Sequence, residues 1–509
     1  MTTYRGAGSA VTGYLVYDAN STTVDSLSSA KSFDAGGVNI LTVLGRSSIG
    51  DGYEGQFYWN SSDLSTEVTA DTQNHIYIPP DSDTTGANGA WVRLYNGWAS
   101  VKWFGAVGDG VTDDTAAIQA ALSTGGNVLF PEGTYMCHGL TSTTNFQILY
   151  FIGKSVLKKN ANGAILTVSG QRTGQYNARY DGDSTNYTGH NLVKTAAHMV
   201  LDHCSSIDAA SRAVYDSDGN GLRINGTNDY YQTADATASG YDIEITGGGL
   251  YSKIVDIYTS QATGGILIDN AGTVSMLGGQ FGKLTVQNGG GGYYSNCRIN
   301  GNVTINAGSN IFGPCTVSAD VTIGDGITAF SNIIIPDTFE IQSGQTFTLN
   351  DVQDCVIHVE QMQDVGVTVD LSNARADNYI VARRQTYTPV LSSSNADASI
   401  GNGTWPAANY TRQGKRVTVD VDLAFGTTTS FGTGAVRIGL PFTAAAESLG
   451  IARLQDTSGA TYYVATAQAV SGADYVVFYY DSSSAALQAT TPFAWASTDR
   501  LIFTIEIEI

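Results

Sequence analysis

Residues 103–122 read WFGAVGDGVTDDTAAIQAAL, a glycine-rich turn followed by the pattern of one short amphipathic helix. Asp113 and Asp114 fall at the start of this expected helix (113–122), where carboxylates can cap free amides and favour the positive end of the helix dipole. The acidic pair could also indicate catalysis or a metal site, but capping accounts for both residues more simply. The stretch NVLFPEGTY at 127–135 then carries strand, turn and strand signals, so sheet directly follows the helix.

This stretch resembles the entry to the pectate-lyase-like right-handed β-helix of bacteriophage tailspikes and capsule depolymerases. The positions that carry the resemblance are Gly108, Asp109, Gly110, Asp113, Asp114, Thr115, Ala117, Ile118, Gln119, Pro131, Gly133 and Tyr135. In that family the short helix covers the N-terminal end of the solenoid and shields the apolar interior of its first coil. The resemblance therefore implies a parallel β-helix after the helix.

A repeat in the middle of the chain supports the same fold independently. Six segments share an apolar-x-apolar core followed by Gly, Asn or Asp: YDIEITG, GILIDNAG, KLTVQNGG, NVTINAGS, DVTIGDG and TFEIQSG. Their anchors are 23, 18, 19, 18 and 18 residues apart, at Ile245, Ile268, Val286, Ile305, Ile323 and Ile341. A period near 20 with short strands is typical of a β-solenoid. We therefore expect an all-β chain built on a right-handed parallel β-helix.

The five cysteines fit the interior of such a solenoid. They occur at widely spaced positions, without a C-x-x-C pair. Cys297 and Cys315 each precede a repeat anchor by eight residues, as Ile333 precedes Ile341, which predicts an interior stack of core fillers rather than nucleophiles.

Three domains are expected. Residues 1–98 resemble the head that precedes the solenoid in phage tail proteins, through segments such as LGRSSIGDGYEGQFYWN, which implies attachment to a virion tail or baseplate protein. Residues 99–385 form the β-helix. Residues 386–509 contain alternating strands such as RLIFTIEIEI, which indicate a C-terminal antiparallel β-sandwich for trimerisation or glycan binding.

Composition excludes several classes of function. The net charge of −21 disfavours nucleic acid as a partner. The N-terminus lacks signal-peptide features and no run approaches the roughly 20 apolar residues of a membrane span, so we expect synthesis in the host cytoplasm and no membrane insertion. No phosphate-cradling loop precedes a helix, and HMVLDHC at 198–204 matches no ligand spacing. We therefore expect neither cofactor nor metal.

Glycoside hydrolysis requires two carboxyl groups roughly 5 to 9.5 Å apart. Extending the repeat backwards places Leu222 and Ile224 in the core and Arg223 on the outer face, beside Glu244. Arg223 would favour the ionised form of Glu244, which suits a base or nucleophile. The predicted catalytic carboxylates on this face are Asp242, Glu244 and Asp269. The alternative is a surface ion pair with solvated turn residues.

A second reaction, β-elimination on a uronate polymer, requires a cation and a base. The residues that could supply them are Arg223, Tyr230, Tyr231, Lys253, Lys283 and His203. Sugar rings could stack on tyrosine pairs, and the predicted substrate-binding residues are Arg223, Tyr230, Tyr231, Tyr293 and Tyr294. A role in the core or in turns is equally consistent with these tyrosines.

Taken together, the residues and the resemblance predict a homotrimeric phage tailspike in the virion tail that acts at the host cell surface. We expect it to bind a bacterial capsule or O-antigen and to depolymerise it by hydrolysis. The alternatives are a polysaccharide lyase and a non-catalytic receptor-binding spike. An exposed carboxylate pair would favour hydrolysis, a basic groove with Tyr or His would favour elimination, and tyrosine platforms alone would favour a binding spike.

Overall fold

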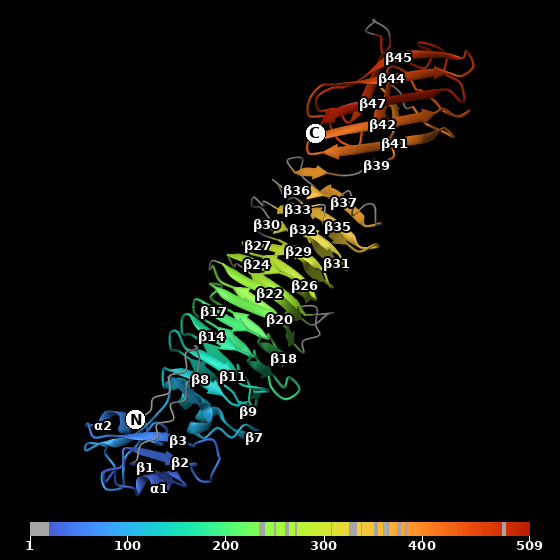
Figure 1. Ribbon diagram of the computed structural model, residues 1–509. Coiled ribbons are helices and arrows are strands. Elements are labelled where there is room, and N and C mark those ends of the chain that lie inside the picture. Colours follow the sequence, from blue (N-terminus) through green and yellow to red (C-terminus); the bar gives the residue numbers. More distant parts are fainter. Residues whose placement is uncertain are drawn as a thin grey trace. The chain divides into compact units, whose positions relative to one another are not determined.

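The computed structural model describes residues 20–233, 240–248, 251–259, 264–269, 272–306, 308–324, 333–336, 338–350, 355–359, 362, 366–373, 378–381, 384–395, 398–480 and 485–509. The chain divides into two compact units, Met1–Asn302 and Val303–Ile509. Both consist mostly of strands (Figure 1). Within the described residues, no helix is long and apolar enough to span a bilayer.

A small mixed sheet opens the first unit, with strand order β1-β2-β3-β5-β4. Its elements are β1 (Ser21–Val24), α1 (Leu27–Lys31), β2 (Ile40–Val43), β3 (Gly55–Asn60), α2 (Ser65–Ala70), β4 (Tyr77–Ile78) and β5 (Ala90–Arg93). Leu41, Phe57 and Trp91 fill its core. The guanidinium of Arg93 lies 4.4 Å from the ring centres of both Phe57 and Trp103.

The helix of the opening motif is α3 (Thr115–Ser123), and it packs against η1 (Val101–Phe104) and β10 (Leu140–Ser142). It begins two residues later than expected. Asp113 accepts the amide hydrogen of Thr115 at 3.0 Å, whereas Asp114 makes no side-chain cap bond. The buried Asp114 carboxylate instead accepts the amides of Val107 and Gly108, at 2.6 and 3.0 Å, and so holds the preceding turn.

Parallel strands of the first unit stack into three ladders, as expected for a right-handed β-helix (Figure 1). The first ladder contains β6 (Trp98–Ser100), β8 (Asn127–Phe130), β11 (Ile148–Phe151), β14 (Thr173–Tyr176), β17 (Met199–Asp202), β20 (Leu222–Thr233), β22 (Ser252–Thr259), β24 (Thr273–Leu277) and β27 (Gly291–Ser295). The second contains β7 (Asp109–Asp113), β9 (Thr134–Cys137), β12 (Val156–Lys159), β15 (Arg179–Asp181), β18 (Ser205–Ala209), the C-terminal parts of β20 and β22, β25 (Gln280–Phe281) and β28 (Cys297–Ile299). The third contains β10, β13 (Leu166–Val168), β16 (Leu192–Lys194), β19 (Val214–Asp216), β21 (Ile243–Thr246), β23 (Gly265–Asp269) and β26 (Lys283–Gln287).

The register corrects the backward extension of the repeat. Ile245 pairs with Asp216 of β19, not with Ile224, and Glu244 lies opposite Tyr215. Residues 222–224 belong to the first ladder, so Arg223 is not beside Glu244. A second correction applies in the second unit, where the partner of Ile323 is Leu349 rather than the predicted anchor Ile341.

The described cysteines are all buried and none forms a disulfide, which matches their predicted role as core fillers. The predicted column is only partly right, because Cys315 pairs with Phe339 and Ile333 pairs with Asn310.

The second unit begins with further parallel coils. Their strands are β29 (Val303–Ile305), β30 (Asn310–Phe312), β31 (Cys315–Val317), β32 (Val321–Ile323), β33 (Ile333–Ile335), β34 (Phe339–Ile341), β35 (Thr346–Asn350), β36 (Val356–His358), β37 (Thr368–Asn373) and β38 (Tyr379–Val381). Antiparallel strands follow: β39 (Gln385–Thr386), β40 (Leu391–Ser393), β41 (Thr404–Gln413), β42 (Arg416–Ala424), β43 (Val436–Gly439), β44 (Ser448–Asp456), β45 (Thr461–Ala469), β46 (Tyr475–Tyr480) and β47 (Arg500–Glu508). They enclose one apolar core that includes Val419, Leu454, Phe478 and Phe503.

Candidate functional site

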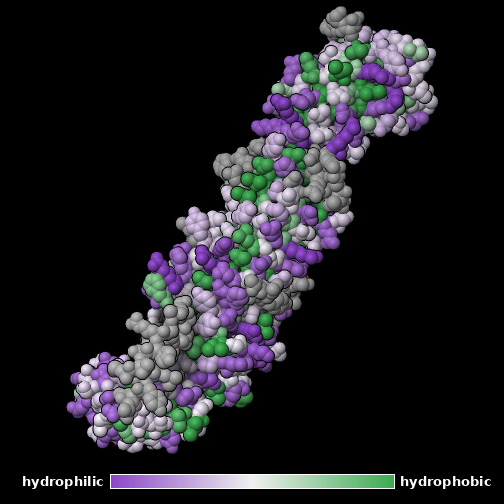
Figure 2. All heavy atoms as spheres, in the orientation of Figure 1, coloured by the Kyte–Doolittle hydropathy of each residue, from purple (hydrophilic) through white to green (hydrophobic). Residues whose placement is uncertain are grey.

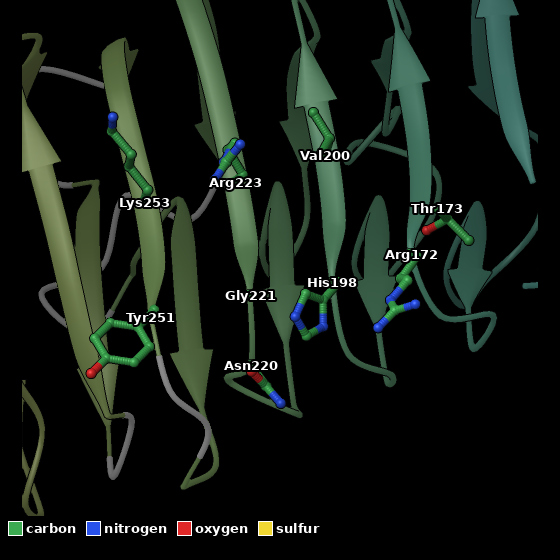
Figure 3. A pocket seen from close by; sticks show the side chains of 9 residues that line it. All are labelled: Arg172, Thr173, His198, Val200, Asn220, Gly221, Arg223, Tyr251 and Lys253. Carbon is green, nitrogen blue, oxygen red and sulfur yellow. The ribbon is translucent and has the colours of Figure 1, made fainter. Parts of the chain in front are cut away.

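A groove of about 590 Å³ lies on the outer face of the first ladder, across β14, β17, β20 and β22 (Figure 3). The residues that line it are Arg172, Thr173, His198, Val200, Asn220, Gly221, Arg223, Tyr251 and Lys253. No carboxylate is among them, although the chain as a whole carries a net charge of −21. The groove is therefore a local cationic site on an acidic protein.

The register of the first ladder brings two cations side by side. Arg223 pairs with Val200 on one side and with Lys253 on the other. Adjacent strands are about 4.8 Å apart, and side chains alternate between the two faces. The inward neighbours Ile224 and Ile254 are buried, whereas Arg223 and Lys253 are exposed. Within the part of the chain that the structure describes, neither cation has an ion-pair partner.

The strand residues Val200, Arg223 and Lys253 form one wall of the groove. The opposite wall is a corner at which successive coils adopt the same left-handed backbone conformation. The φ angles of Arg172, His198, Gly221 and Tyr251 are 55°, 63°, 69° and 64°. A Cβ atom at Gly221 would lie 3.2 Å from the ring of His198. Since the other three coils hold large side chains in this conformation, the missing side chain at Gly221 creates the hollow between His198 and Tyr251.

The predicted carboxylates lie elsewhere, on the third ladder. Asp242 is completely buried, which corrects the prediction that it shares an outer face with Glu244. Glu244 accepts a hydrogen bond from Nε of Arg212 at 2.6 Å, so Arg212 takes the place predicted for Arg223. Asp269 accepts a hydrogen bond from Asn288 at 2.7 Å. Glu244 and Asp269 do lie on neighbouring strands, with Asp269 opposite Thr246.

An ion pair and stacked rings surround Glu244. The ring of His190 stacks on that of Tyr215 with centres 4.8 Å apart. Burial, followed by the charges of Arg212 and Lys159, lowers the pKa of His190 to about 4, so this ring is neutral at pH 7. The side chains of His190, Arg212, Tyr215 and Glu244 are each partly buried.

The predicted tyrosine platforms divide between core and surface. Tyr231 and Tyr294 are buried, and burial raises the pKa of Tyr294 well above its usual range. Tyr293 is 40 % exposed on the outer face of β27. The side chain of Tyr230 lies outside the described residues. Two of the predicted tyrosines therefore fill the core.

The two remaining candidates for elimination chemistry make contacts away from the groove. His203 hydrogen-bonds to its neighbour Asp202. The ammonium group of Lys283 lies 4.2 Å from the ring centre of Tyr241 on the third ladder. Among the described residues, no three His, Cys, Asp or Glu side chains are grouped so that they could hold a metal ion.

A right-handed parallel β-helix with a polar groove on an outer face defines a pectate-lyase-like protein. The chain belongs to the rhamnogalacturonase A/epimerase, pectate lyase-like family, whose family model matches residues 98–367.

Sequence relatives are distant and partial. The chain is 36% identical over 126 residues to the Mu-like prophage FluMu defective tail fiber protein of Haemophilus influenzae, covering 24% of this chain and 20% of that protein. It is 37% identical over 97 residues to mannuronan C5-epimerase AlgE1 of Azotobacter vinelandii, covering 15% of this chain and 7% of the epimerase. The chain thus spans a fifth or less of the length of these two relatives.

Solved tailspikes share the fold. The enzymatically active domain of bacteriophage CBA120 tailspike protein 2 superimposes with a TM-score of 0.50 at 12% identity, covering 96% of this chain and 86% of that domain. The Dettilon tailspike protein aligns with a TM-score of 0.45 at 12% identity, over 81% of this chain and 94% of that one. The resemblance to phage tailspike β-helices predicted from the sequence is confirmed.

Proposed function

We propose that this protein is a virion tailspike that binds and depolymerises an acidic bacterial surface polysaccharide in the groove of the first ladder. The observation that carries the proposal is the exposed pair of cations Arg223 and Lys253, which have no ion-pair partner among the described residues and lie in a groove lined by no carboxylate. A uronate carboxylate fits two adjacent cations, whereas an acidic groove would repel it. The family membership and the matches to proteins named mannuronan C5-epimerases support a uronate substrate.

The groove favours β-elimination over hydrolysis. In this reaction a base removes the proton from C5 of the uronate, the C4–O4 bond breaks, and a C4=C5 double bond forms. Negative charge develops on the carboxylate in the transition state, where Arg223 and Lys253 would stabilise it. Tyr251 and His198, on the corner wall, are the groups that would remove the C5 proton and protonate the departing oxygen.

Hydrolysis remains a second candidate because of one observation on the third ladder. Glu244 and Asp269 lie diagonally on neighbouring strands, a placement compatible with a glycosidase pair. Arg212 already donates a hydrogen bond to Glu244, and the side-chain amides of Gln287 and Asn288 donate hydrogen bonds to Asp269. The groove is therefore the better supported site.

Simultaneous assays of two products distinguish these reactions. The purified protein is incubated with alginate, polygalacturonate and surface polysaccharides of candidate hosts, while reducing ends and ultraviolet absorbance of unsaturated uronates are followed together. We expect both signals to rise. Reducing ends without absorbance would assign the reaction to hydrolysis and direct mutagenesis to Glu244 and Asp269. Binding without either signal would leave a receptor-binding spike.

We further propose that residues 1–98 attach the protein to the virion tail or baseplate, that residues 99–385 bind and cleave the polysaccharide, and that residues 386–509 assemble a homotrimer. Apolar side chains are visible among polar ones over the C-terminal strands in Figure 2. On the outer face of the β44–β45 pair, Leu449, Ile451, Tyr462 and Val464 are each more than half exposed. Such a patch on a sheet indicates a protein interface.

Replacing Ile451 with glutamate should dissociate the trimer, because a charge would be buried in the apolar interface. Light scattering should give about three times 53.5 kDa for the native chain and about 53.5 kDa for the variant. Ser458→Glu, in the exposed turn between the same strands, should remain trimeric. A monomeric native chain, or a trimeric Ile451→Glu variant, would contradict this assignment.

A further inference from the structure

A row of aromatic rings lies on the outer face of the first ladder, N-terminal to the groove. It consists of Trp98 on β6, Tyr150 on β11 and Tyr176 on β14. The ring centres of Trp98 and Tyr150 are 6.1 Å apart, and those of Tyr150 and Tyr176 are 6.3 Å apart. We call these three residues the aromatic row.

The register places the aromatic row on the same face as the cation pair. Tyr176 pairs with Asp202, which in turn pairs with Asn225. Asn225 is two residues beyond Arg223, so both side chains project from the same side of β20. Strand β17 separates the last ring of the row from the strand that carries Arg223. The row and the groove therefore form consecutive parts of one surface.

The neighbouring residues leave the rings of the aromatic row partly accessible and let the Tyr176 ring lie close to the backbone of the sheet. Tyr150 is 40 % exposed, while the alternate residue Leu149 is buried. A Cβ atom at Gly174 would lie 3.1 Å from the ring of Tyr176. Because Gly174 has no side chain, the Tyr176 ring can lie over the backbone and leave its other face towards solvent.

The chemistry of the row differs from that of the groove. One charged residue lies among the register positions that surround its rings: Asp202, opposite Tyr176 on β17. The other positions are uncharged, and they are Ser100, Leu129, Asn127, Ile148 and Gly174. The planes of Tyr150 and Tyr176 are inclined by 32° and those of Trp98 and Tyr150 by 77°, so each ring offers its own face to the apolar C–H face of a pyranose. The carboxylate of Asp202 beside Tyr176 would repel an acidic sugar but not a neutral one.

We propose that the aromatic row is a binding site for neutral pyranose rings, which stack on Trp98, Tyr150 and Tyr176. This inference rests on the function proposed above. The site would hold the neutral sugars of a mixed polysaccharide while the acidic sugar of the same polymer occupies the groove. The polymer then runs along the first ladder, across successive strands. Stacking on the row itself does not depend on the reaction in the groove.

Neutral oligosaccharides test the row separately from the groove. Saturation-transfer NMR is measured on the full chain with gluco-, manno- and galacto-configured hexasaccharides at millimolar concentration. We expect ring-proton signals from at least one hexasaccharide with the native chain and with Arg223→Ala. In the Tyr150→Ala and Tyr176→Ala variants this signal should be at least five-fold weaker. Replacing Tyr58, an exposed tyrosine of β3, with alanine should leave the signal unchanged.

Two further variants separate sugar stacking from packing between coils. Tyr150→Phe should keep the signal because the flat ring remains, and Tyr150→Leu should lose it at an unchanged melting temperature. Absence of signal from the native chain, or an unchanged signal in Tyr150→Leu and Tyr176→Ala, would overturn the proposal. Retained turnover of acidic polysaccharide by Arg223→Ala would instead overturn the function assigned to the groove.

Discussion

Arg223→Ala is expected to reduce kcat/KM for an acidic polysaccharide by about 100-fold, because it removes a donor aimed at the charge that develops on the uronate carboxylate. The loss should be mainly in kcat, since that charge is larger in the transition state than in the bound substrate. Arg223→Lys should recover part of the activity, as it restores the charge without the bidentate geometry. Initial rates of unsaturated-uronate formation measure these changes.

Arg179→Ala provides the matched control. Arg179 is an exposed arginine on β15, in the same unit but outside the groove, and its loss should change kcat/KM less than two-fold. Native binding should also weaken with added salt, because the Debye length falls to about 3 Å at 1 M. Full activity of Arg223→Ala together with an inactive Glu244→Gln variant would move the reaction to the third ladder.

The fold could be predicted because its signals are local and repeated. The entry motif, the short apolar-x-apolar strands and the alternation in β47 each follow from burying one side of a strand. The pairing register between coils could be predicted only where the coils have equal length, because the turns between ladders vary in length. The step from Asp216 to Ile245 is 29 residues and that from Ile323 to Leu349 is 26, whereas the intervening repeats suggested 18 to 23.

The groove was only partly visible in the sequence for the same reason. Arg223 and Lys253 were identified by residue type, but a register error placed Arg223 beside Glu244, and none of the predicted tyrosines whose side chains are described lines the groove. Arg172, His198 and Tyr251 were missed because their shared feature is a left-handed corner, which no common residue type marks. One signal was present: Arg172 and His198 are 26 residues apart, as are Tyr150 and Tyr176 on the same ladder.

Asp216→Ala should destabilise the protein by about 3 kcal/mol, the lower end of the usual cost of removing one partner from a buried ion pair. Among the described residues, Lys194 then keeps only the 3.4 Å contact between its Nζ and the partly exposed carboxylate of Asp218. Asp216 lies opposite Lys194 in the third ladder, and Oδ1 of Asp216 is 2.8 Å from Nζ of Lys194. Both side chains are completely buried. Asp216 also accepts the amide of Gly219 at 3.0 Å, so its removal frees a second polar group. The midpoint of guanidinium denaturation, followed by circular dichroism, measures the loss.

Two comparisons separate the charge effect from loss of packing. The double variant Lys194→Met/Asp216→Leu removes both charges while keeping apolar volume, and it should recover most of the stability that Asp216→Ala loses. Lys158 and Asp181 form a pair of similar type at 3.4 Å, but both are partly exposed. Asp181→Ala should therefore change stability by less than about 1 kcal/mol. If Asp216→Ala changed stability as little as Asp181→Ala, the ammonium group of Lys194 would not depend on Asp216, and the coil interior around Lys194 would have to admit water. If the double variant were as unstable as Asp216→Ala, the loss would come from the shape of the coil rather than from the broken Lys194–Asp216 ion pair.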